Sequence, residues 1–461
     1  MKLYNTLTRT VEEFIPREEG KVKLYTCGPT VYSYAHIGNI RNYIGHDILD
    51  KTLRYLGYEV TRCMNITDVG HLTSDSDSGE DKMIKAMRRE NKTAMEIAKF
   101  YTDEFFKDFN LVNNKMPEFV SPATDHINDY IEIITKLIEK GYAYINENVY
   151  FDTTKLDDYY VLTNHKEDEM VVGVREGVEE DSKKKNQNDF VLWFTSSKFE
   201  NQELQWDSPW GRGYPGWHIE CTGISIKYLG EYLDIHGGGV DNIFPHHTNE
   251  IAQSESYLGH SWCHYWFHNE HLLDETGKMS KSAGAILTVT KLKEDGYDPL
   301  AYRFMCLNSH YRKQLVFSYD ALRQSEDTLN KLRERIKNIV DDNNYSEEDF
   351  NKYNDLFKDA LSNDLNTANA ITVLYDVLKA DISNKTKLEL IKSFDKVLSL
   401  DLIKEKEISK ELEDKVYDLL VLRDKYKTEK NYEKADEVRK EIESLGATIK
   451  DTREGSIVIW N

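Results

Sequence analysis

Residues 21–66 carry the clearest fold signal in the chain and read KVKLYTCGPTVYSYAHIGNIRNYIGHDILDKTLRYLGYEVTRCMNI. The first seven alternate polar and apolar side chains and end at a Gly-Pro pair, which predicts a strand followed by a loop. Apolar residues at helical spacing predict a helix over residues 41–57, and residues 59–66 predict a second strand. This order is typical of a βαβ unit, so we expect an α/β fold with a parallel sheet.

A candidate phosphate-binding position follows the first strand of this unit. In a parallel sheet, ligands bind beyond the strand ends, where the free N–H groups of the next helix favour anions. His36, Gly38 and Asn39 lie there. A His can donate to a phosphate, and a Gly lets the backbone approach a nucleotide. Taken alone, these few residues would more often be a loop His beside a turn Gly.

The composition indicates a cytoplasmic protein of several structural units. A chain of 461 residues is too long for one hydrophobic core, and 39% hydrophobic residues suffice for globular interiors. No apolar stretch approaches the roughly 18 residues of a membrane span, and the first residues lack the apolar core of a signal peptide. Five scattered cysteines, an odd number, favour reduced thiols, some of which could bind a metal.

The net charge of −21 argues by itself against a nucleic-acid partner, because phosphate contacts need Lys and Arg. Net charge does not describe local charge, however, and a basic face could still exist. The acidic balance would then keep the remaining surface soluble and discourage unspecific RNA binding.

Four residues from three distant parts of the sequence form a candidate metal site. Pro245 opens a predicted helix on which His246 and Glu250, four residues apart, share one face. Two thiolates, from Cys27 and Cys221, would complete a ligand set that suits tetrahedral Zn2+. Spacing alone favours a simpler interpretation, in which the cysteines are small buried side chains and the helix residues pair, because no CxxC motif requires a metal.

Two further motifs fit a nucleotide. Three glycines at residues 237–239 turn a predicted strand end toward Asp241, a plausible ribose contact. The sequence GKMSKS at residues 277–282 places Lys278 and Lys281 in a compact polar loop. Two ammonium groups could follow phosphate charge as it moves onto a leaving pyrophosphate. By itself this loop could equally be a solvated turn.

The chain resembles the class I aminoacyl-tRNA synthetases, and within them the cysteinyl-tRNA synthetase family, through four motifs in order: CGPTVYSYAHIGN, PGWHIEC, HGGGVDNIFPHHTNE and GKMSKS. The resemblance runs from Leu3 to the C-terminus, where EKNYEKADEVRKEIESLGATIKDTREGSIVIW is similar to the family's ending. Each motif is weak alone, but their joint order and spacing are highly specific.

The resemblance implies a Rossmann-type parallel-sheet catalytic domain split by an insertion, followed by an α-helical bundle and a small C-terminal anticodon-binding domain. The expected boundaries are 1–120 and 201–260 for the two catalytic halves, the second with zinc ligands, 121–200 for the connective insertion, 261–325 for a stem-contact region with the Lys loop, 326–405 for the tRNA-binding bundle and 406–461 for the anticodon-binding domain. Periodicity independently predicts helices near residues 321–340, 347–362, 367–382 and 385–398.

The resemblance also assigns residues to roles. The family's zinc ligands, two cysteines, a histidine and a glutamate, correspond to Cys27, Cys221, His246 and Glu250. One zinc per chain would select cysteine, because a thiolate completes a zinc shell better than the harder hydroxyl of serine. Thr67 and Trp217 occupy positions that flank the bound cysteine. The implied ATP contacts are His36, Gly38, Asn39, Gly238, Asp241 and Lys281, and the implied catalytic groups are His36, Asn39, Lys278 and Lys281.

The implied activity is the ligation of L-cysteine to tRNA(Cys). The cysteine carboxylate would attack the α-phosphorus of ATP, with Mg2+ expected, to give cysteinyl-adenylate and pyrophosphate. A ribose hydroxyl of the terminal tRNA adenosine would then take the cysteinyl group, while the phosphate-binding groups close from two sides. The resemblance further implies a cytoplasmic monomer without membrane contact.

One position departs from the family's pattern. The family signature commonly ends in His where this chain has Asn39. An Asn donates hydrogen bonds but cannot carry a positive charge, so we expect a weaker or differently tuned phosphate contact at this position.

Three alternatives remain from the sequence. A related ligase could activate cysteine and transfer it to a small amine, but such relatives lack the anticodon-reading end that this chain keeps. A catalytically silent tRNA-binding paralogue is disfavoured because both lysines of the loop and all four metal positions are intact. A zinc-structured scaffold without chemistry would leave the ATP motifs unexplained.

Overall fold

The computed structural model forms two compact units, Met1–Leu402 and Ile403–Asn461, which are described separately. The residues that the structure describes are 1–69, 82–163, 182–195, 203–274, 277–278, 286–403, 410–452 and 455–460.

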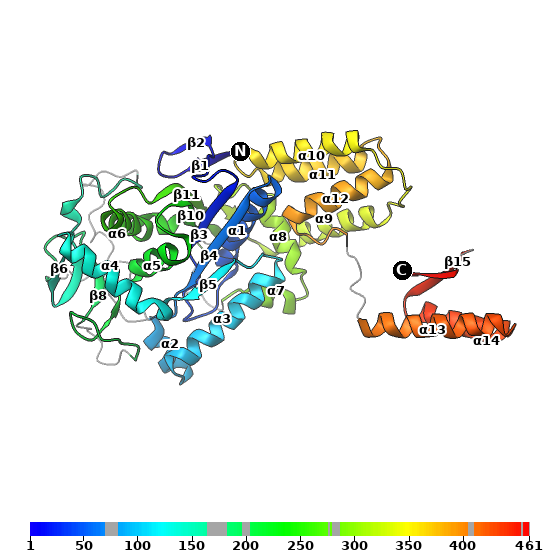
Figure 1. The fold of residues 1–461 in the computed structure, drawn as a ribbon, viewed down its shortest axis with the longest axis horizontal. Helices are drawn as coiled ribbons and strands as arrows, with labels where there is room; N and C mark the ends of the chain where they lie inside the picture. Colours follow the sequence, from blue (N-terminus) through cyan, green and yellow to red (C-terminus); the bar gives the residue numbers. More distant parts are fainter. Residues whose placement is uncertain are drawn as a thin grey trace. The chain divides into compact units, whose positions relative to one another are not determined.

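A five-stranded parallel sheet forms the centre of the first unit (Figure 1). Its strands are β3 (Lys21–Thr26), β4 (Glu59–Ile66), β5 (Phe119–Pro122), β10 (Leu233–Gly239) and β11 (Cys263–Asn269). They lie in the order β11-β10-β3-β4-β5, and every neighbouring pair is parallel. The expected Rossmann-type sheet is therefore confirmed.

From the neighbouring strands β3 and β10 the chain connects to the next strand in opposite directions across the sheet, and such a switch point predicts the place of a ligand. From β3 the chain passes through helix α1 (Ile37–Tyr55) to β4 on one side, and from β10 it passes through α6 (Thr248–Leu258) to β11 on the other. Figure 1 shows α1 on one side of the sheet and α6 with α5 (Trp217–Leu229) on the other. Ligands bind at the carboxyl ends of strands beside such a switch point.

Helix α1 begins at Ile37, four residues before the start that apolar periodicity predicts. The cause is a local cap. The His36 ring accepts a hydrogen bond from the Asn39 N–H, and the Asn39 side chain accepts one from the His36 N–H. This reciprocal capping box satisfies free N–H groups of the first turn, so the helix extends through the motif itself.

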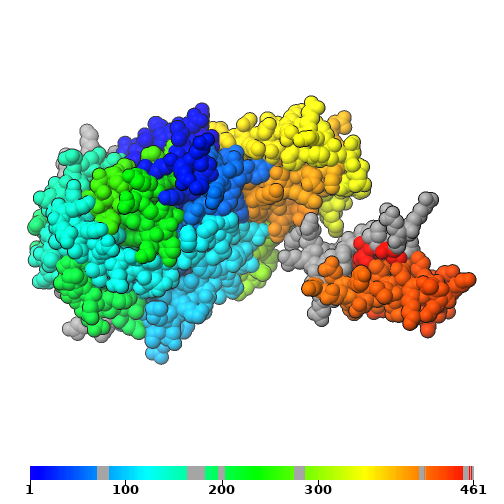
Figure 2. Space-filling model, in the orientation of Figure 1, coloured from blue at the N-terminus to red at the C-terminus, as the bar shows by residue number. Residues whose placement is uncertain are grey.

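An insertion separates β5 from β10 in the sequence. It contains helix α4 and the four-stranded antiparallel sheet β6-β7-β8-β9, in which all five side chains of β8 are buried. In Figure 2 the blue segments, which come early in the chain, adjoin the green segments on one surface. The two catalytic halves, which this insertion separates in the sequence, therefore pack together. The bounds are 3-10 turn Ala123–His126, α4 Ile127–Glu139, β6 Ala143–Asn146, β7 Asn148–Phe151, 3-10 turn Thr153–Lys155, β8 Phe190–Phe194 and β9 Tyr214–Pro215.

Smaller elements surround the sheet. Strands β1 and β2 form an antiparallel hairpin, and β12, β13 and β14 form a separate small sheet. The bounds are β1 Lys2–Asn5, β2 Thr10–Glu13, α2 Lys82–Glu90, α3 Ala94–Leu111, 3-10 turn Val240–Asn242, π-helical turn Ile243–His247, β12 Leu272–Asp274, β13 Gly277–Lys278, α7 Val289–Glu294, α8 Pro299–Leu307 and β14 Leu315–Val316.

The helical bundle closes the first unit. Its helices are α9 (Tyr319–Lys337), α10 (Glu347–Ser362), α11 (Thr367–Lys379) and α12 (Asn384–Leu398), which match the four helices that periodicity predicts to within about three residues at each end. Each has a Ser or Asn cap whose side chain accepts from the first turn, which explains why their starts can be read from the sequence.

The second unit is a helical pair with a hairpin. Helices α13 (Lys410–Thr428) and α14 (Tyr432–Ser444) precede the antiparallel strands β15 (Ala447–Thr452) and β16 (Gly455–Trp460). Its core is made of Val416, Leu420, Val438, Ile442, Ala447 and Ile449. Across the described residues of both units, no helix combines the length and apolar character needed to cross a membrane.

Candidate active site

A cavity of about 290 Å3 lies at the carboxyl ends of the parallel strands. Residues that follow four strands contribute to its wall: Cys27 after β3, Thr67 after β4, Asp241 after β10 and Asn269 at the end of β11. The first turn of α1 and Trp217 of α5 also line the cavity. This is the position that the switch in strand order predicts for a ligand.

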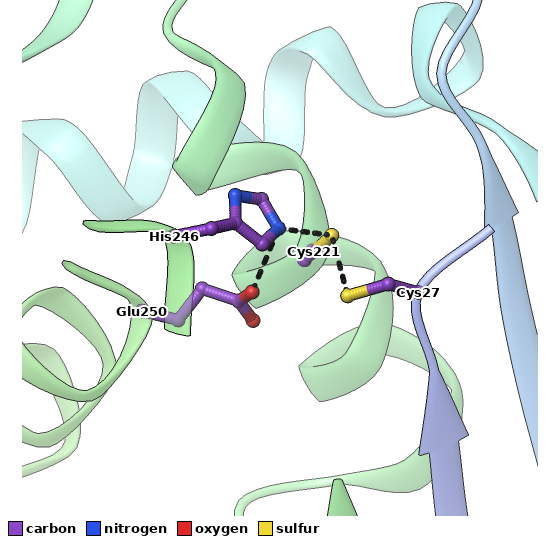
Figure 3. Close-up of side chains that lie close together, drawn as sticks. All are labelled: Cys27, Cys221, His246 and Glu250. Atoms are coloured by element: carbon purple, nitrogen blue, oxygen red, sulfur yellow. Dashed lines mark hydrogen bonds and ion pairs between the residues drawn. The ribbon is translucent and has the colours of Figure 1, made fainter. Parts of the chain in front are cut away.

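The four predicted metal ligands meet at the buried end of this cavity (Figure 3). The Nε2 atom of His246 lies 3.4 Å from Sγ of Cys221 and 3.0 Å from Oε1 of Glu250. The Sγ atoms of Cys27 and Cys221 are 4.0 Å apart. One donor atom from each of the four residues lies within 4.8 Å of the others, and all four residues are buried. A single metal ion therefore fits among them.

The surroundings of the four donors decide which of them hold protons when no metal is bound. Burial lowers the pKa of His246, but the neighbouring Glu250 carboxylate and Cys221 raise it to about 10. Burial would raise the pKa of Glu250, yet His236 and His246 hold it below its usual value. Burial raises the pKa of the Cys27 thiol and raises that of Cys221 further. A metal that binds here must displace these protons.

Neighbouring side chains orient two of the four donors. The Nδ1 atom of His246 pairs with Nδ1 of His218 at 2.9 Å, which directs Nε2 of His246 toward the cluster. The Oε2 atom of Glu250 pairs with Nε2 of His236 at 2.8 Å, which leaves Oε1 toward His246. Such second partners fix the ring and carboxylate orientations that metal ligands need.

A second set of donors overlaps the first. Cys27 and Glu250 also lie within the same distance limit of His236 and His247, and Sγ of Cys27 is 3.3 Å from Nε2 of His247. Neither of these histidines lines the cavity, whereas Cys27, Cys221 and His246 do. The first set is therefore the one from which a metal could reach a molecule bound in the cavity.

Comparison with known proteins places the chain in a family. Residues 13–327 match the family model described as tRNA synthetases class I (C) catalytic domain, and residues 356–402 match the DALR domain. The chain is 45% identical to a cysteine–tRNA ligase of Treponema denticola over 98% of each protein, and 43% identical to one of Borreliella burgdorferi over 99% of each.

The chain belongs to the cysteine–tRNA ligase family. Its fold is also similar to that of a solved methionyl-tRNA synthetase of Mycobacterium tuberculosis bound by methionyl-adenylate, with a TM-score of 0.57, 14% identity, and coverage of 83% of this chain and 91% of that one. At this identity the likeness concerns the fold alone.

The predicted phosphate motif at the start of α1 borders the same cavity as the metal cluster. His36, Gly38 and Asn39 line it and are each half-buried. Because Nδ1 of His36 accepts the Asn39 N–H at 3.2 Å, a neutral ring carries its proton on Nε2. A Cβ at Gly38 would lie 2.9 Å from that ring, so a larger residue would push against it. The Oδ1 atom of Asn39 is used in the cap, at 3.1 Å from the His36 N–H.

The residues expected to flank the amino acid border the same cavity. Thr67 and Trp217 both line the cavity, and the centre of the Trp217 ring lies 4.4 Å from that of His246, with the two ring planes tilted by 36°. Asp241 lines the cavity and is exposed. Gly238 lies deeper, where a Cβ would be 2.6 Å from Cε1 of His247, while its neighbour Gly239 lines the cavity.

The lysines of the GKMSKS motif are not placed. Lys281 lies outside the described residues, and only the backbone of Lys278 is described, in strand β13, where it pairs with Leu273. Both remain predictions from the family pattern.

Several wall residues of the cavity are absent from the sequence predictions. Tyr101 and Phe105 line it from α3, but their spacing is that of any buried helix face. Asn42 and Asn269 also line it, and Nδ2 of Asn269 donates to Oδ1 of Asn42 at 2.8 Å. Only the tertiary fold brings these two amides together. Asn65 also lines the cavity, and its Nδ2 atom donates to Oγ1 of Thr67.

Proposed function

We propose that this chain is a cysteine–tRNA ligase, which activates L-cysteine with ATP and transfers it to the 3′-terminal adenosine of tRNA(Cys). One observation carries this proposal. A single cavity is bordered both by the buried cluster of sulfur, nitrogen and oxygen donors and by the start of α1, in a chain that is similar over 98% of its length to a curated cysteine–tRNA ligase.

The residues at the buried end fit Zn2+. Two thiolates, one imidazole and one carboxylate are ligands that zinc accepts in tetrahedral sites, and a catalytic site needs room for a further ligand. When bound, zinc supplies a soft partner for a thiolate and a poor one for the hydroxyl of serine. Cys27, Cys221, His246 and Glu250 would hold it, and Trp217 would pack the substrate against His246.

The start of α1 supplies the phosphate contacts in this proposal. The helix N-terminus favours anions, and His36 offers its Nε2 proton to a phosphate oxygen. The amide of Asn39 keeps Oδ1 in the cap, so Nδ2 is its remaining group for a phosphate. Lys278 and Lys281 are proposed to neutralise the phosphates from the other side, with Mg2+, and Gly238 and Asp241 to contact the nucleotide.

The reaction then has two steps. The carboxylate of cysteine attacks the α-phosphorus of ATP, the bond to the bridging oxygen breaks, and pyrophosphate leaves. The 2′- or 3′-hydroxyl of the terminal adenosine next attacks the cysteinyl carbonyl, and AMP leaves. The protein contributes mainly position and charge, by holding the carboxylate against the phosphorus and stabilising charge on the phosphate oxygens.

The two units divide the substrates between them in this proposal. All wall residues of the cavity belong to the first unit, and the second unit would read the anticodon. Basic side chains of this unit are candidate RNA contacts, at Lys425, Lys427, Lys430, Lys434, Arg439 and Lys440. The monomeric state, the cytoplasmic location and the domain boundaries given above stay predictions.

Two assays on the full chain test the function. Cysteine-dependent exchange of pyrophosphate into ATP separates an enzyme from a silent tRNA-binding protein or a zinc scaffold. Charging of tRNA(Cys) then separates a tRNA ligase from a ligase that uses a small amine. Both assays are run with metal-replete protein and with protein treated with a chelator. Exchange without charging would overturn the tRNA assignment, and full activity in metal-free protein would overturn the zinc assignment.

A further inference from the structure

One buried amide joins the ends of two central strands beside the cavity. Asn65, near the end of β4, is 1% exposed. Its Oδ1 atom accepts the backbone N–H of Gly28 at 2.8 Å, and its Nδ2 atom donates to Oγ1 of Thr67 at 2.9 Å. Gly28 directly follows the metal-ligand position Cys27. One side chain thus connects the strand end that carries a metal ligand to the residue expected beside the substrate.

The two strand ends approach each other closely at this point. A Cβ at Gly28 would lie 1.6 Å from the backbone oxygen of Asn65, so only glycine fits there. Beyond the paired strands, the Val31 N–H donates to the backbone carbonyl oxygen of Thr67 at 3.1 Å. The Thr67 N–H donates to the backbone carbonyl oxygen of Pro29 at 3.0 Å. The backbone therefore holds Thr67 in place without the Asn65 side chain.

What the Asn65 side chain controls is the direction of a hydrogen bond. A backbone N–H can only donate, so the Gly28 contact requires Oδ1 of Asn65 on that side and leaves Nδ2 for Thr67. Because an amide nitrogen only donates, Oγ1 of Thr67 must accept. The hydroxyl proton of Thr67 is then free to point elsewhere, and among the described residues no acceptor is paired with it.

We infer that Asn65 is a positioning residue that turns the Thr67 hydroxyl proton toward the cavity, where it donates to the carboxylate of the amino-acid substrate. This inference rests on the proposed function. Both residues line the cavity wall. Among the charged head groups of an amino acid, the carboxylate accepts hydrogen bonds and the ammonium only donates, so an outward-directed donor selects the carboxylate. A donor on one carboxylate oxygen also orients the other for attack on ATP.

The insertion supplies an internal control with the same arrangement. Asn148 in β7 is also buried; its Oδ1 atom accepts the Thr195 N–H at 2.9 Å, and its Nδ2 atom donates to the hydroxyl of Tyr150 at 3.2 Å. Here too the hydroxyl belongs to the residue two positions later. Asn148 does not line the cavity, so it reports what the loss of such a bond costs the fold alone.

The main test is Asn65→Asp in the full chain, assayed by pyrophosphate exchange at a pH of about 8. The substitution keeps the volume and the acceptor for Gly28 but replaces the donor to Thr67 with an oxygen. Two donors facing the new carboxyl favour its ionised form. The Thr67 proton then turns to that carboxylate and away from the cavity. We expect the KM for cysteine to rise roughly 10- to 100-fold, the size of one lost hydrogen bond to a charged group, with the KM for ATP within about twofold.

Three comparisons separate this role from a structural one. Asn148→Asp should leave both KM values within about twofold. In a Thr67→Val background, Asn65→Asp should add no further loss, because the hydroxyl that it redirects is gone. Cysteamine, which lacks the carboxylate, should compete with cysteine equally well in the wild type and the Asn65→Asp variant.

Each contrary result would overturn the inference. An equal rise in both KM values would assign Asn65 to general packing, and an equal loss in the Thr67→Val background would show that it acts through another group. Weaker cysteamine binding would show that the Thr67 proton does not serve the carboxylate. A wild type without cysteine-dependent exchange would instead refute the proposed function, before Asn65 is tested.

Discussion

Two parts of the site differ in where their residues come from: the metal cluster, which is the buried end, and the start of α1, which is the helix end. Cys27, Cys221, His246 and Glu250 derive from three segments across more than two hundred residues, and packing removes all of them from solvent. His36 and Asn39 lie three residues apart, remain half-buried, and hold each other by a local capping box. The chemistry of the first group depends on the whole fold, whereas that of the second forms with one helix turn.

The largest effect should follow a change at the buried end. Cys221→Ser replaces a thiolate donor with a hydroxyl that remains protonated and binds zinc poorly. Changes to residues that only orient metal ligands commonly cost about 10- to 100-fold, so loss of a ligand should lower metal affinity and cysteine-dependent exchange by at least about 1,000-fold.

Metal analysis after dialysis and pyrophosphate exchange measure this change. Cys306→Ser is the matched control, since Cys306 is also a buried free cysteine but lies on α8, away from the cluster. If Cys221→Ser kept stoichiometric zinc and full activity, Cys221 would not be a metal ligand on which cysteine activation depends.

The buried end should also bind metal more tightly as pH rises. In the metal-free protein burial raises the pKa of the Cys27 and Cys221 thiols, and the pKa of His246 is about 10, so all three hold protons near neutral pH. A metal must displace them, and its apparent affinity should increase by about two to three decades per pH unit between roughly pH 6 and 8.

Competition of metal-free protein with a chelator of known affinity, measured across this pH range, gives the slope of the logarithm of apparent metal affinity against pH. A slope near zero would mean that the four donors are already deprotonated before metal binds.

The helix end should respond through ATP alone. Asn39→Asp keeps an acceptor for the His36 N–H but removes the amide donor and adds a negative charge beside the phosphates. We expect the KM for ATP to rise about 10- to 100-fold, with zinc content unchanged and the KM for cysteine within about threefold.

Asn39→His is the opposite change, because it restores the residue that is common in the family and can carry a positive charge. It should strengthen adenylate formation relative to Asn39→Asp. Identical exchange rates for Asn39→His and the wild type would show that this position contributes little to phosphate contact.

The smallest effect concerns the helix start itself. Asn39→Ala removes the side-chain acceptor of the His36 N–H, a loss of about 1 kcal/mol for a helix cap. Hydrogen exchange in the first turn of α1 should therefore become roughly fivefold faster, while exchange in α6 stays unchanged. Equal acceleration in both helices would indicate a global loss of stability instead of a local cap.

The sequence predicted regular elements well where local signals are strong. Strand β4 has the predicted bounds, 59–66, and the bundle helices begin at Ser or Asn caps, which are recognisable in the sequence. The start of α1 was predicted four residues late. Apolar periodicity begins at Arg41, but the cap that starts the helix is made by polar side chains of the motif itself.

The amino-acid sequence by itself determined the family, the parallel α/β fold and the identity of the four candidate metal donors, because ordered motifs and periodic patterns are properties of the chain. Only the tertiary structure decided that those donors share one cavity with His36 and Asn39, and that Asn65 directs the Thr67 hydroxyl. Distances between residues far apart in sequence, and the direction of a buried hydrogen bond, arise from packing, which no local pattern encodes.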